Sequence, residues 1–200
     1  MARSDVQLML GAKAGDEASF DELLHRYRTP VVNFIHRMVR DQAAAEDLAQ
    51  EVFIRVYNAR NKYTPSAKFT TWLFRICTNL ALNSLRDGRR RQKEVSLDAP
   101  PEEDAARLDV PSREPRIDER LMERDRARAI RRAIDRLPEK QRAAVLMHKY
   151  QEMEYAEIAD ALDCSESALK SLLFRAYETL RVELSSLVGA PAAFSAGEGG

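Results

Sequence analysis

The side chains best suited to chemistry gather in residues 69–93, where amide, guanidinium and indole groups recur at helical spacing. Two arginines and two asparagines follow one another at intervals of four, four and three residues, which places them on one face of a helix. With an indole one turn earlier, the set is Trp72, Arg75, Asn79, Asn83 and Arg86. Amides can bond the edges of unpaired bases, an aromatic ring can stack on their faces, and arginine can pair with phosphate. The pattern predicts a surface for unstacked nucleic acid, whereas the simpler interpretation is an amphipathic core helix with a solvated basic end.

No other reactive side chain is placed for catalysis or for metal binding. His25, His36 and His148 have no second ligand or catalytic group at a useful spacing. Cys77 and Cys164 form no CxxC or Cys/His pair. A carboxylate cluster, a nucleophile with its base and a nucleotide-binding loop are also missing from the sequence. We therefore expect a binding protein that is not an enzyme and that needs no cofactor and no metal.

Helical patterns upstream must hold this surface in place. Residues 16–39 repeat apolar side chains at three- and four-residue spacings, and Pro30 is expected to kink or divide that helix. A second helix is expected from about residue 41 to residue 60. Its inward face should hold Leu48, Val52, Phe53 and Val56.

The helix that carries the polar row should bury its opposite side. Thr70 or Thr71 could accept the free backbone amides at its start. Asp87-Gly88 predicts its end, because glycine readily takes the left-handed conformation that closes helices. The buried side is expected to comprise Leu73, Ile76, Cys77 and Leu80.

The sharpest local pattern lies near the C-terminus, after two helices that Pro138 separates. Ala159 is followed by a turn at Asp163-Cys164 and then by the apolar Leu169, which is the spacing of a helix-turn-helix. The alanine is needed because two helices cross closely there, and aspartate can replace the usual glycine of the turn. Ser165 is expected to cap the second helix.

Charge divides the chain into unlike parts. Residues 1–93 hold 16 Lys and Arg against 10 Asp and Glu, residues 94–125 hold 5 against 11, and residues 126–200 hold 11 against 11. Residues 94–118 also contain four prolines and show no helical period, which predicts a flexible acidic linker. Its acidity could mimic nucleic acid or could simply keep two modules apart and soluble.

The expected architecture is all-α, with two small helical domains joined by that linker. The expected boundaries are residues 1–93 for the first domain, 94–118 for the linker, 119–187 for the second domain and 188–200 for a disordered tail. No apolar run approaches the roughly 20 residues that cross a bilayer, and the N-terminus lacks the apolar core of a signal peptide. We expect a cytoplasmic protein without membrane insertion.

The segments AAAEDLAQEVFIRVYNAR and KFTTWLFRICTNLALNSLRDGRRR, residues 43–60 and 68–91, resemble the second conserved region of sigma-70 family sigma factors. The likeness is to the small, two-domain extracytoplasmic-function group. It implies that a helix with a D-x-x-Q-E pattern docks on the β′ clamp helices of core RNA polymerase. Asp47, Gln50 and Glu51 occupy that pattern.

The same resemblance implies that the next helix opens the minus-10 promoter element and captures a flipped base of the non-template strand. The residues at the matching positions are Trp72, Arg75, Asn79, Asn83 and Arg86. The family commonly has a basic or polar residue between the two asparagines, where this chain has Leu80 and Leu82.

The C-terminal segments LPEKQR, EIADALDCSES and KSLLFRA resemble the fourth conserved region of the same group. That likeness implies docking on the β flap of the polymerase and reading of the minus-35 element in the major groove. The implied contact residues are Ser165, Ser167, Lys170, Ser171 and Arg175. The family often has arginine where Leu172 stands, and Leu172 could contact a thymine methyl or belong to the core.

Two resemblances in the expected order predict a transcription initiation factor. It would bind core RNA polymerase, recognise minus-10 and minus-35 promoter DNA, and help to open the promoter. The resemblance also implies an anti-sigma factor as a partner. The first alternative is a stand-alone helix-turn-helix regulator of duplex DNA, and the second is a helical enzyme acting on nucleic acid, such as a nuclease.

Overall fold

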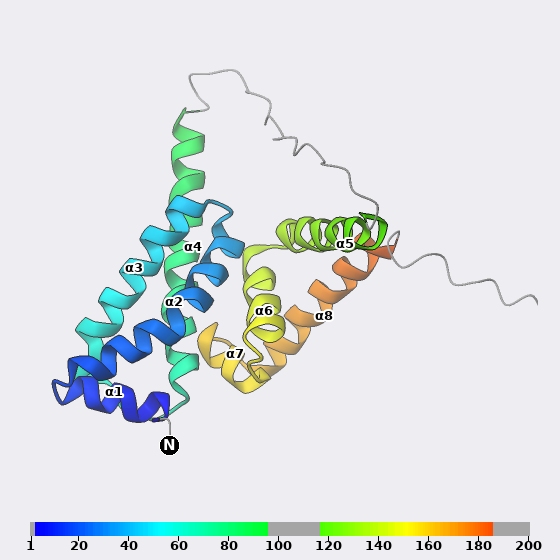
Figure 1. Ribbon diagram of the computed structural model, residues 1–200. Coiled ribbons are helices and arrows are strands. Elements are labelled where there is room, and N and C mark those ends of the chain that lie inside the picture. The colour runs from blue at the N-terminus through cyan, green and yellow to red at the C-terminus, as the bar shows by residue number, and fades with distance from the viewer. Residues whose placement is uncertain (1–2, 96–116, 186–200) are drawn as a thin grey trace, which may run out of the picture.

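In the computed structural model, the described residues are 3–95 and 117–185, and side chains are described for 3–91 and 124–185. Every regular element in these ranges is helical, so the prediction of an all-α fold is confirmed (Figure 1). The expected linker lies largely outside the described residues, and the expected tail lies wholly outside them. The helices are α1 (Asp5–Lys13), α2 (Glu17–Val39), α3 (Gln42–Ala59), the 3-10 turn η1 (Arg60–Lys62), α4 (Phe69–Val95), α5 (Ile117–Arg136), α6 (Glu139–Tyr150), α7 (Tyr155–Ala161) and α8 (Glu166–Glu183).

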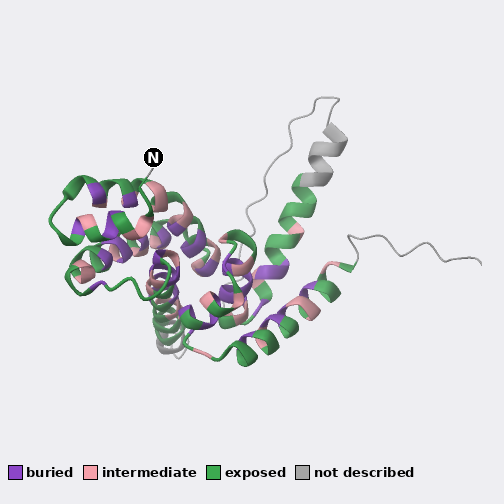
Figure 2. Cartoon of the chain, turned by 90° about the horizontal axis from the view of Figure 1, so that it is seen from below, coloured by how far each residue is buried: buried purple, intermediate pink, exposed green. Residues whose placement is uncertain are grey.

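The first module, α1 to α4, is a helical bundle around one aromatic and aliphatic core. Phe34 of α2 and Phe74 of α4 are both 1% exposed, and their rings meet edge to face with centroids 5.2 Å apart. The inward residues expected of α3 are confirmed, since Val52, Phe53 and Val56 are buried and Leu48 is partly buried. Figure 2 shows the buried segments on the inner sides of the helices and the exposed segments on the outside.

Helix α1 was not expected from the sequence, because its apolar pattern is short. It begins at the capping box of Ser4, whose hydroxyl accepts a hydrogen bond from the Gln7 amide at 3.3 Å. Gly11 lets α1 approach α2, because a Cβ added there would lie 2.5 Å from Ser19 Oγ. The Asp5 carboxylate accepts a hydrogen bond from the Tyr27 hydroxyl at 2.5 Å and ties the same two helices together.

Two expectations about the boundaries of α4 were wrong. Helix α4 does not stop at Asp87-Gly88 but continues to Val95, because nothing forces Gly88 into the left-handed conformation and the arginines after it favour helix. Neither Thr70 nor Thr71 caps its start. The Lys68 carbonyl accepts the Thr71 amide at 3.1 Å, so the cap position is Lys68 and both threonines lie inside the helix. Pro30 likewise does not divide α2, which runs unbroken from Glu17 to Val39.

The second module, α5 to α8, contains the predicted helix-turn-helix. Ala159 is 3% exposed where α7 and α8 meet, and its carbonyl accepts the Cys164 amide at 3.0 Å. Asp163 has φ 52°, the left-handed conformation expected of the turn. Ser165 caps α8 by accepting a hydrogen bond from the Ala168 amide at 3.2 Å, as predicted. Leu169 is completely buried.

The two modules pack directly against each other, with α4 beside α7 and α2 beside α6 (Figure 1). The final turns of α4 project beyond the first module. In the described ranges, no helix combines the length and the apolar character that a bilayer crossing requires.

Candidate nucleic-acid interface

The polar row predicted from the sequence forms one exposed face of α4. Its members Arg75, Asn79, Asn83 and Arg86 are all exposed. On the other side of the helix, Leu73 and Cys77 are completely buried, and Ile76 is partly buried. The helical period therefore separates a face that packs on the first module from a face that can meet a ligand.

The two leucines between the asparagines belong to the packed side. Leu80 is 6% exposed, and Leu82 is partly buried against the same core. A polar residue at position 80 would be buried without a partner, which is costly. The packing therefore assigns Leu80 to the core of the first module.

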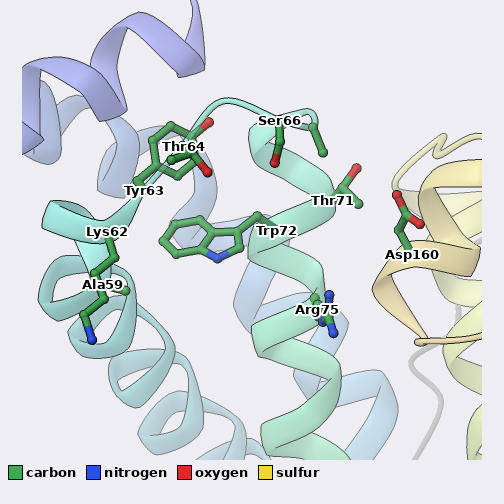
Figure 3. A pocket seen from close by; sticks show the side chains of 10 residues that line it. Ala59, Lys62, Tyr63, Thr64, Ser66, Thr71, Trp72, Arg75 and Asp160 are labelled. Atoms are coloured by element: carbon green, nitrogen blue, oxygen red, sulfur yellow. The ribbon is translucent and has the colours of Figure 1, made fainter.

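A pocket opens beside this row, between α4 and the loop that precedes it (Figure 3). Its volume is about 410 Å³. It is lined by Ala59, Lys62, Tyr63, Thr64, Ser66, Ala67, Thr71, Trp72, Arg75 and Asp160. The sequence pointed to Trp72 and Arg75 but not to the loop residues, whose only sequence signal was their place directly before the polar helix.

Aromatic contacts fix one wall of the pocket. Trp72 is half-buried, and its ring centroid lies 5.3 Å from that of Tyr63 and 6.0 Å from that of Phe69. Lys13 Nζ of α1 donates to the Tyr63 carbonyl at 2.8 Å, which holds the loop in place. The wall is therefore pre-formed, and little side-chain entropy would be lost when a planar ligand packs on it.

Two hydroxyls in the pocket wall have unused hydrogen-bonding capacity. Tyr63 and Thr71 are 5% and 4% exposed, and neither hydroxyl finds a hydrogen-bond partner among the described residues. Burial, with a smaller effect of Asp5, raises the pKa of Tyr63, so its hydroxyl stays protonated. Both hydroxyl oxygens are themselves buried, which is uncommon for hydroxyls without a partner.

The far side of the pocket belongs to the second module. Asp160 of α7 faces the α4 residues Thr71 and Arg75 across the pocket (Figure 3). The Arg75 guanidinium also pairs with the Asp163 carboxylate at 3.7 Å. The exposed row and the helix-turn-helix are thus brought together, which the sequence did not predict.

A second surface lies on α3, where Asp47 and Gln50 are exposed and Glu51 is partly exposed. Glu51 forms an ion pair with Arg55 one turn later, at 2.7 Å. Ile54, four residues after Gln50 on the same face, is 54% exposed. Of the three polar residues, Gln50 lines a groove of about 550 Å³ between α2 and α3. Its apolar lining comprises Phe20, Leu24, Val32, Ala49, Phe53, Ile54 and Tyr57.

A third surface lies on the outer face of α8. Its expected DNA contacts Ser165, Ser167, Lys170, Ser171 and Arg175 are all exposed, although Ser165 is also engaged as the helix cap. Leu172 is partly buried against the core, which favours the core interpretation of that residue.

Sequence reasoning missed Phe174 on this face. Its side chain is 69% exposed, three residues after Ser171 and four after Lys170. That spacing could have identified it, because an apolar residue on the polar side of a recognition helix has no core to fill.

The remaining reactive groups serve the fold. Cys77 is completely buried, and burial raises the pKa of its thiol, which suppresses the reactive thiolate. His148 Nδ1 lies 2.6 Å from the Tyr177 hydroxyl inside the second module. Within the described ranges, no three His, Cys, Asp or Glu side chains converge as metal ligands.

Comparison with known proteins agrees with the order of the two modules. The family profile described as Sigma-70 region 2 matches residues 23–91, and the profile described as Sigma-70, region 4 matches residues 127–180. Among solved structures, CnrH in complex with the cytosolic domain of CnrY has a TM-score of 0.62 at 19% identity, covering 90% of this chain and 96% of CnrH. RpoE of Bartonella quintana, solved with the anti-sigma factor NepR, has a TM-score of 0.63 at 18% identity, covering 83% of this chain and 96% of RpoE. These likenesses show a shared fold.

Two sequence relatives extend over nearly the whole chain. The RNA polymerase sigma-H factor of Pseudomonas aeruginosa is 33% identical over 189 residues, which cover 92% of this chain and 95% of the relative. The ECF RNA polymerase sigma-E factor of Escherichia coli K12 is 28% identical over 185 residues, which cover 92% and 96%. The chain belongs to the sigma-70 family of RNA polymerase sigma factors, in its extracytoplasmic-function group.

Proposed function

We propose that the chain is a transcription initiation factor that binds core RNA polymerase, recognises two promoter elements and stabilises the melted strand. The observation that carries this proposal is the position of the pocket beside the exposed row of α4. In the proposed division of labour, residues 1–93 bind the polymerase and the minus-10 element. Residues 119–187 bind the minus-35 element, and residues 94–118 join the two modules.

The pocket suits a base that has left the duplex. Trp72 offers an aromatic surface, and Arg75 can meet the adjoining phosphate. Asn79 and Asn83 continue the same face along α4 and can bond further exposed bases. The two asparagine amides would bond the Watson-Crick edges of the bases, which are free only in a melted strand.

The free energies of base extrusion and of base stacking indicate that the assembled polymerase, and not this chain alone, melts the duplex. Extruding one base from a duplex requires a few kcal/mol. Stacking on an aromatic side chain returns only about 1–3 kcal/mol per base. The chain alone should therefore hold a strand that is already single but should not open a duplex.

The α3 surface is the proposed dock for the β′ clamp helices. Asp47, Gln50 and Glu51 supply polar contacts, and the apolar groove beside Ile54 can bury part of a partner helix. The second module would meet the β flap. On this proposal the chain works in the cytoplasm as a binding protein, without a catalytic reaction or cofactor of its own.

An anti-sigma factor is a further proposed partner. RpoE of Bartonella quintana was solved with an anti-sigma factor bound, and it shares the two-module fold with this chain. The stand-alone regulator is less well supported, because it would leave the α3 surface and the pocket beside α4 without a role.

The test combines Asn79→Ala with Asn83→Ala. Both side chains are exposed, so the fold should be kept while promoter opening, measured by permanganate reactivity of unpaired thymines, should be strongly reduced. Association with core polymerase, measured by native gel shift, should not change. Asn33→Ala, an exposed asparagine on α2, is the matched control. Equal loss of opening and of association would assign the two asparagines to folding or docking instead.

A further inference from the structure

Helix α5 carries a dense set of exposed arginines to which the proposed function gives no role. Within residues 124–136, the part of α5 whose side chains are described, six arginines stand against two aspartates. The segment contains no lysine, and its net charge is +4 over 13 residues. The six arginines are all exposed: Arg124, Arg126, Arg128, Arg131, Arg132 and Arg136.

Four of these arginines form one row on the outer side of the helix. Ala133, Ile134 and Leu137 are buried against the second module. At about 3.6 residues per turn, the side opposite to them holds the α5 arginine row, which comprises Arg124, Arg128, Arg131 and Arg132. Like charges four residues apart destabilise a helix, so this row weakens α5 instead of supporting it.

Carboxylates neutralise little of the row. Asp125 lies 3.8 Å from Arg128, while Asp135 pairs with an arginine of α2. Among the side chains that the structure describes, no ion pair engages Arg124 or Arg132. The row therefore presents guanidinium groups that an anionic ligand can bind.

The positive charge of the second module is concentrated on α5, away from the proposed minus-35 contacts. The helix-turn-helix, residues 154–185, holds seven acidic side chains and three basic ones. Arg136 pairs with Glu183 in the last turn of α8. At about 1.5 Å per residue, Glu183 lies about 12 Å along α8 from Arg175 and about 24 Å from Ser167. Figure 1 shows α7 at one end of α8 and α5 beside the other end.

The chemistry of the row suits a single nucleic-acid strand. Guanidinium groups bind phosphate through paired hydrogen bonds and can stack on unpaired bases. A protein partner is less well matched, because protein interfaces depend on large apolar or aromatic anchors. Ile130, which is 39% exposed, is the only such exposed group within residues 124–136. A duplex read by α8 would lie at the other end of that helix. In the complex that the proposed function requires, the other nucleic acid is the transcript.

We propose that the α5 arginine row binds single-stranded RNA, and that the transcript made by the polymerase is its ligand. The identity of that RNA rests on the proposed function, whereas the binding itself is a property of this chain. The row contacts phosphates, so it binds RNA without regard to sequence. Neutralised phosphates release their counterions, so the affinity falls steeply as salt is added.

Three substitutions in the full-length chain remove most of the row: Arg124→Gln, Arg128→Gln and Arg132→Gln. Glutamine forms helix about as well as arginine, so α5 should remain folded, which circular dichroism verifies. The matched control removes three exposed cations elsewhere in the second module and has the same net charge: Lys140→Gln, Lys149→Gln and Arg181→Gln. A third protein keeps the charge of the row: Arg124→Lys, Arg128→Lys and Arg132→Lys.

Fluorescence anisotropy of an unstructured RNA oligonucleotide supplies the measurement. Three lost phosphate contacts should reduce the slope of log affinity against log salt by about 2, at about 0.7 per contact for a single strand. Between about 50 and 200 mM salt, the parent chain should therefore lose roughly 15-fold more affinity than the glutamine variant. The control and the lysine variant should keep the slope of the parent. An equal slope for the parent and the glutamine variant would overturn the proposal. A greater loss of binding to duplex DNA than to RNA would overturn it too, because the row would then be a duplex-binding surface.

Adding Asn79→Ala and Asn83→Ala to each protein separates this inference from the proposed function. The added substitutions remove the contribution of α4, and the difference between the parent and the glutamine variant should persist. RNA binding that is lost through the asparagines alone would assign the RNA to α4 and overturn the proposal. If the row binds RNA but the chain does not support transcription by core polymerase, the proposed function fails while the RNA-binding surface stands.

Photocrosslinking in stalled transcription complexes tests the transcript as the ligand. A photoreactive group at the 5′ end of transcripts of increasing length should crosslink to α5 in the parent chain and in the control. The crosslink should be lost with the glutamine variant. Transcripts that never crosslink to α5 at any length would overturn the assignment of the transcript.

Discussion

Asn79 and Asn83 lie one helical turn apart on the exposed face of α4, and each amide can both donate to and accept from a base edge. Neither side chain is needed by the core, which Leu73, Cys77 and Leu80 fill from the other side of the helix. The same separation recurs on α8, where Leu169 and Leu173 are buried while Lys170 and Arg175 are exposed. Asn79, Asn83, Lys170 and Arg175 can therefore be changed with little effect on the fold.

Arg175→Ala should weaken promoter binding in the polymerase complex by about 1–3 kcal/mol if the guanidinium contacts a base edge. The expected effect shrinks when the upstream element is deleted, because the contact then has no target. The measurement compares the affinities of the parent complex and the Arg175→Ala complex for matched promoter fragments with and without that element. An effect of the same size on both fragments would show that Arg175 does not read the upstream element.

The lowered pKa of His148 predicts that the stability of the second module depends on pH. Burial, then the charge of Lys149, lowers its pKa below the ordinary 6.5, and its ring lies between Tyr155 and Tyr177. The unfolded chain therefore takes up the proton more readily, and stability is lost as the pH falls through 6.5 towards the folded pKa.

Thermal unfolding at a series of pH values from about 7.5 to 5 tests this linkage. The parent chain should lose more stability over that range than His148→Gln, which has no ring to titrate. Parallel curves for the two proteins would show that His148 does not contribute to the acid sensitivity.

Helix α4 is longer than its sequence suggested, because Gly88 is an interior position and not a stop. A Cβ at Gly88 would meet nothing within 4 Å. Gly88→Ala should therefore stabilise the helix by about 0.5–1 kcal/mol, the difference between the helix propensities of the two residues.

Circular dichroism and thermal unfolding of Gly88→Ala supply the readout. We expect slightly more helix and a higher unfolding temperature. A lower unfolding temperature would mean that Gly88 needs the left-handed conformation and that α4 ends there.

The sequence could predict elements whose signal is local and could not predict those that depend on tertiary contacts. Helices α2, α3 and α8 are long and amphipathic, so their sequence periods predict them. The turn at Asp163 is predicted by its spacing from Ala159 and Leu169. Helix α1 has almost no amphipathic pattern and depends on contacts such as Asp5 with Tyr27, which pair residues from different helices.

The same distinction applies to the candidate interface. The row from Arg75 to Arg86 follows from helical spacing alone. The pocket beside it could not be predicted, because it forms only when the loop containing Tyr63 is anchored by Lys13 and closed by Asp160 of the second module. Lys13, Tyr63 and Asp160 are far apart in the sequence, so no local pattern links them.

Across the whole molecule, the uneven charge of the sequence has a structural counterpart. The first 93 residues carry six more cationic than acidic side chains, and cations of this part meet carboxylates of α5, α6 and α7. Exposed charge pairs contribute little to stability individually, at about 0–1 kcal/mol each.

Transcription in vitro by purified core RNA polymerase on fragmented genomic DNA decides whether the chain is an initiation factor. With the chain present, sequenced transcript starts should cluster downstream of one shared pair of promoter elements. These transcripts should disappear with Asn79→Ala and Asn83→Ala, while association with the core enzyme persists. A chain that does not associate with core polymerase, or an identical set of transcripts in its absence, would contradict the proposed function.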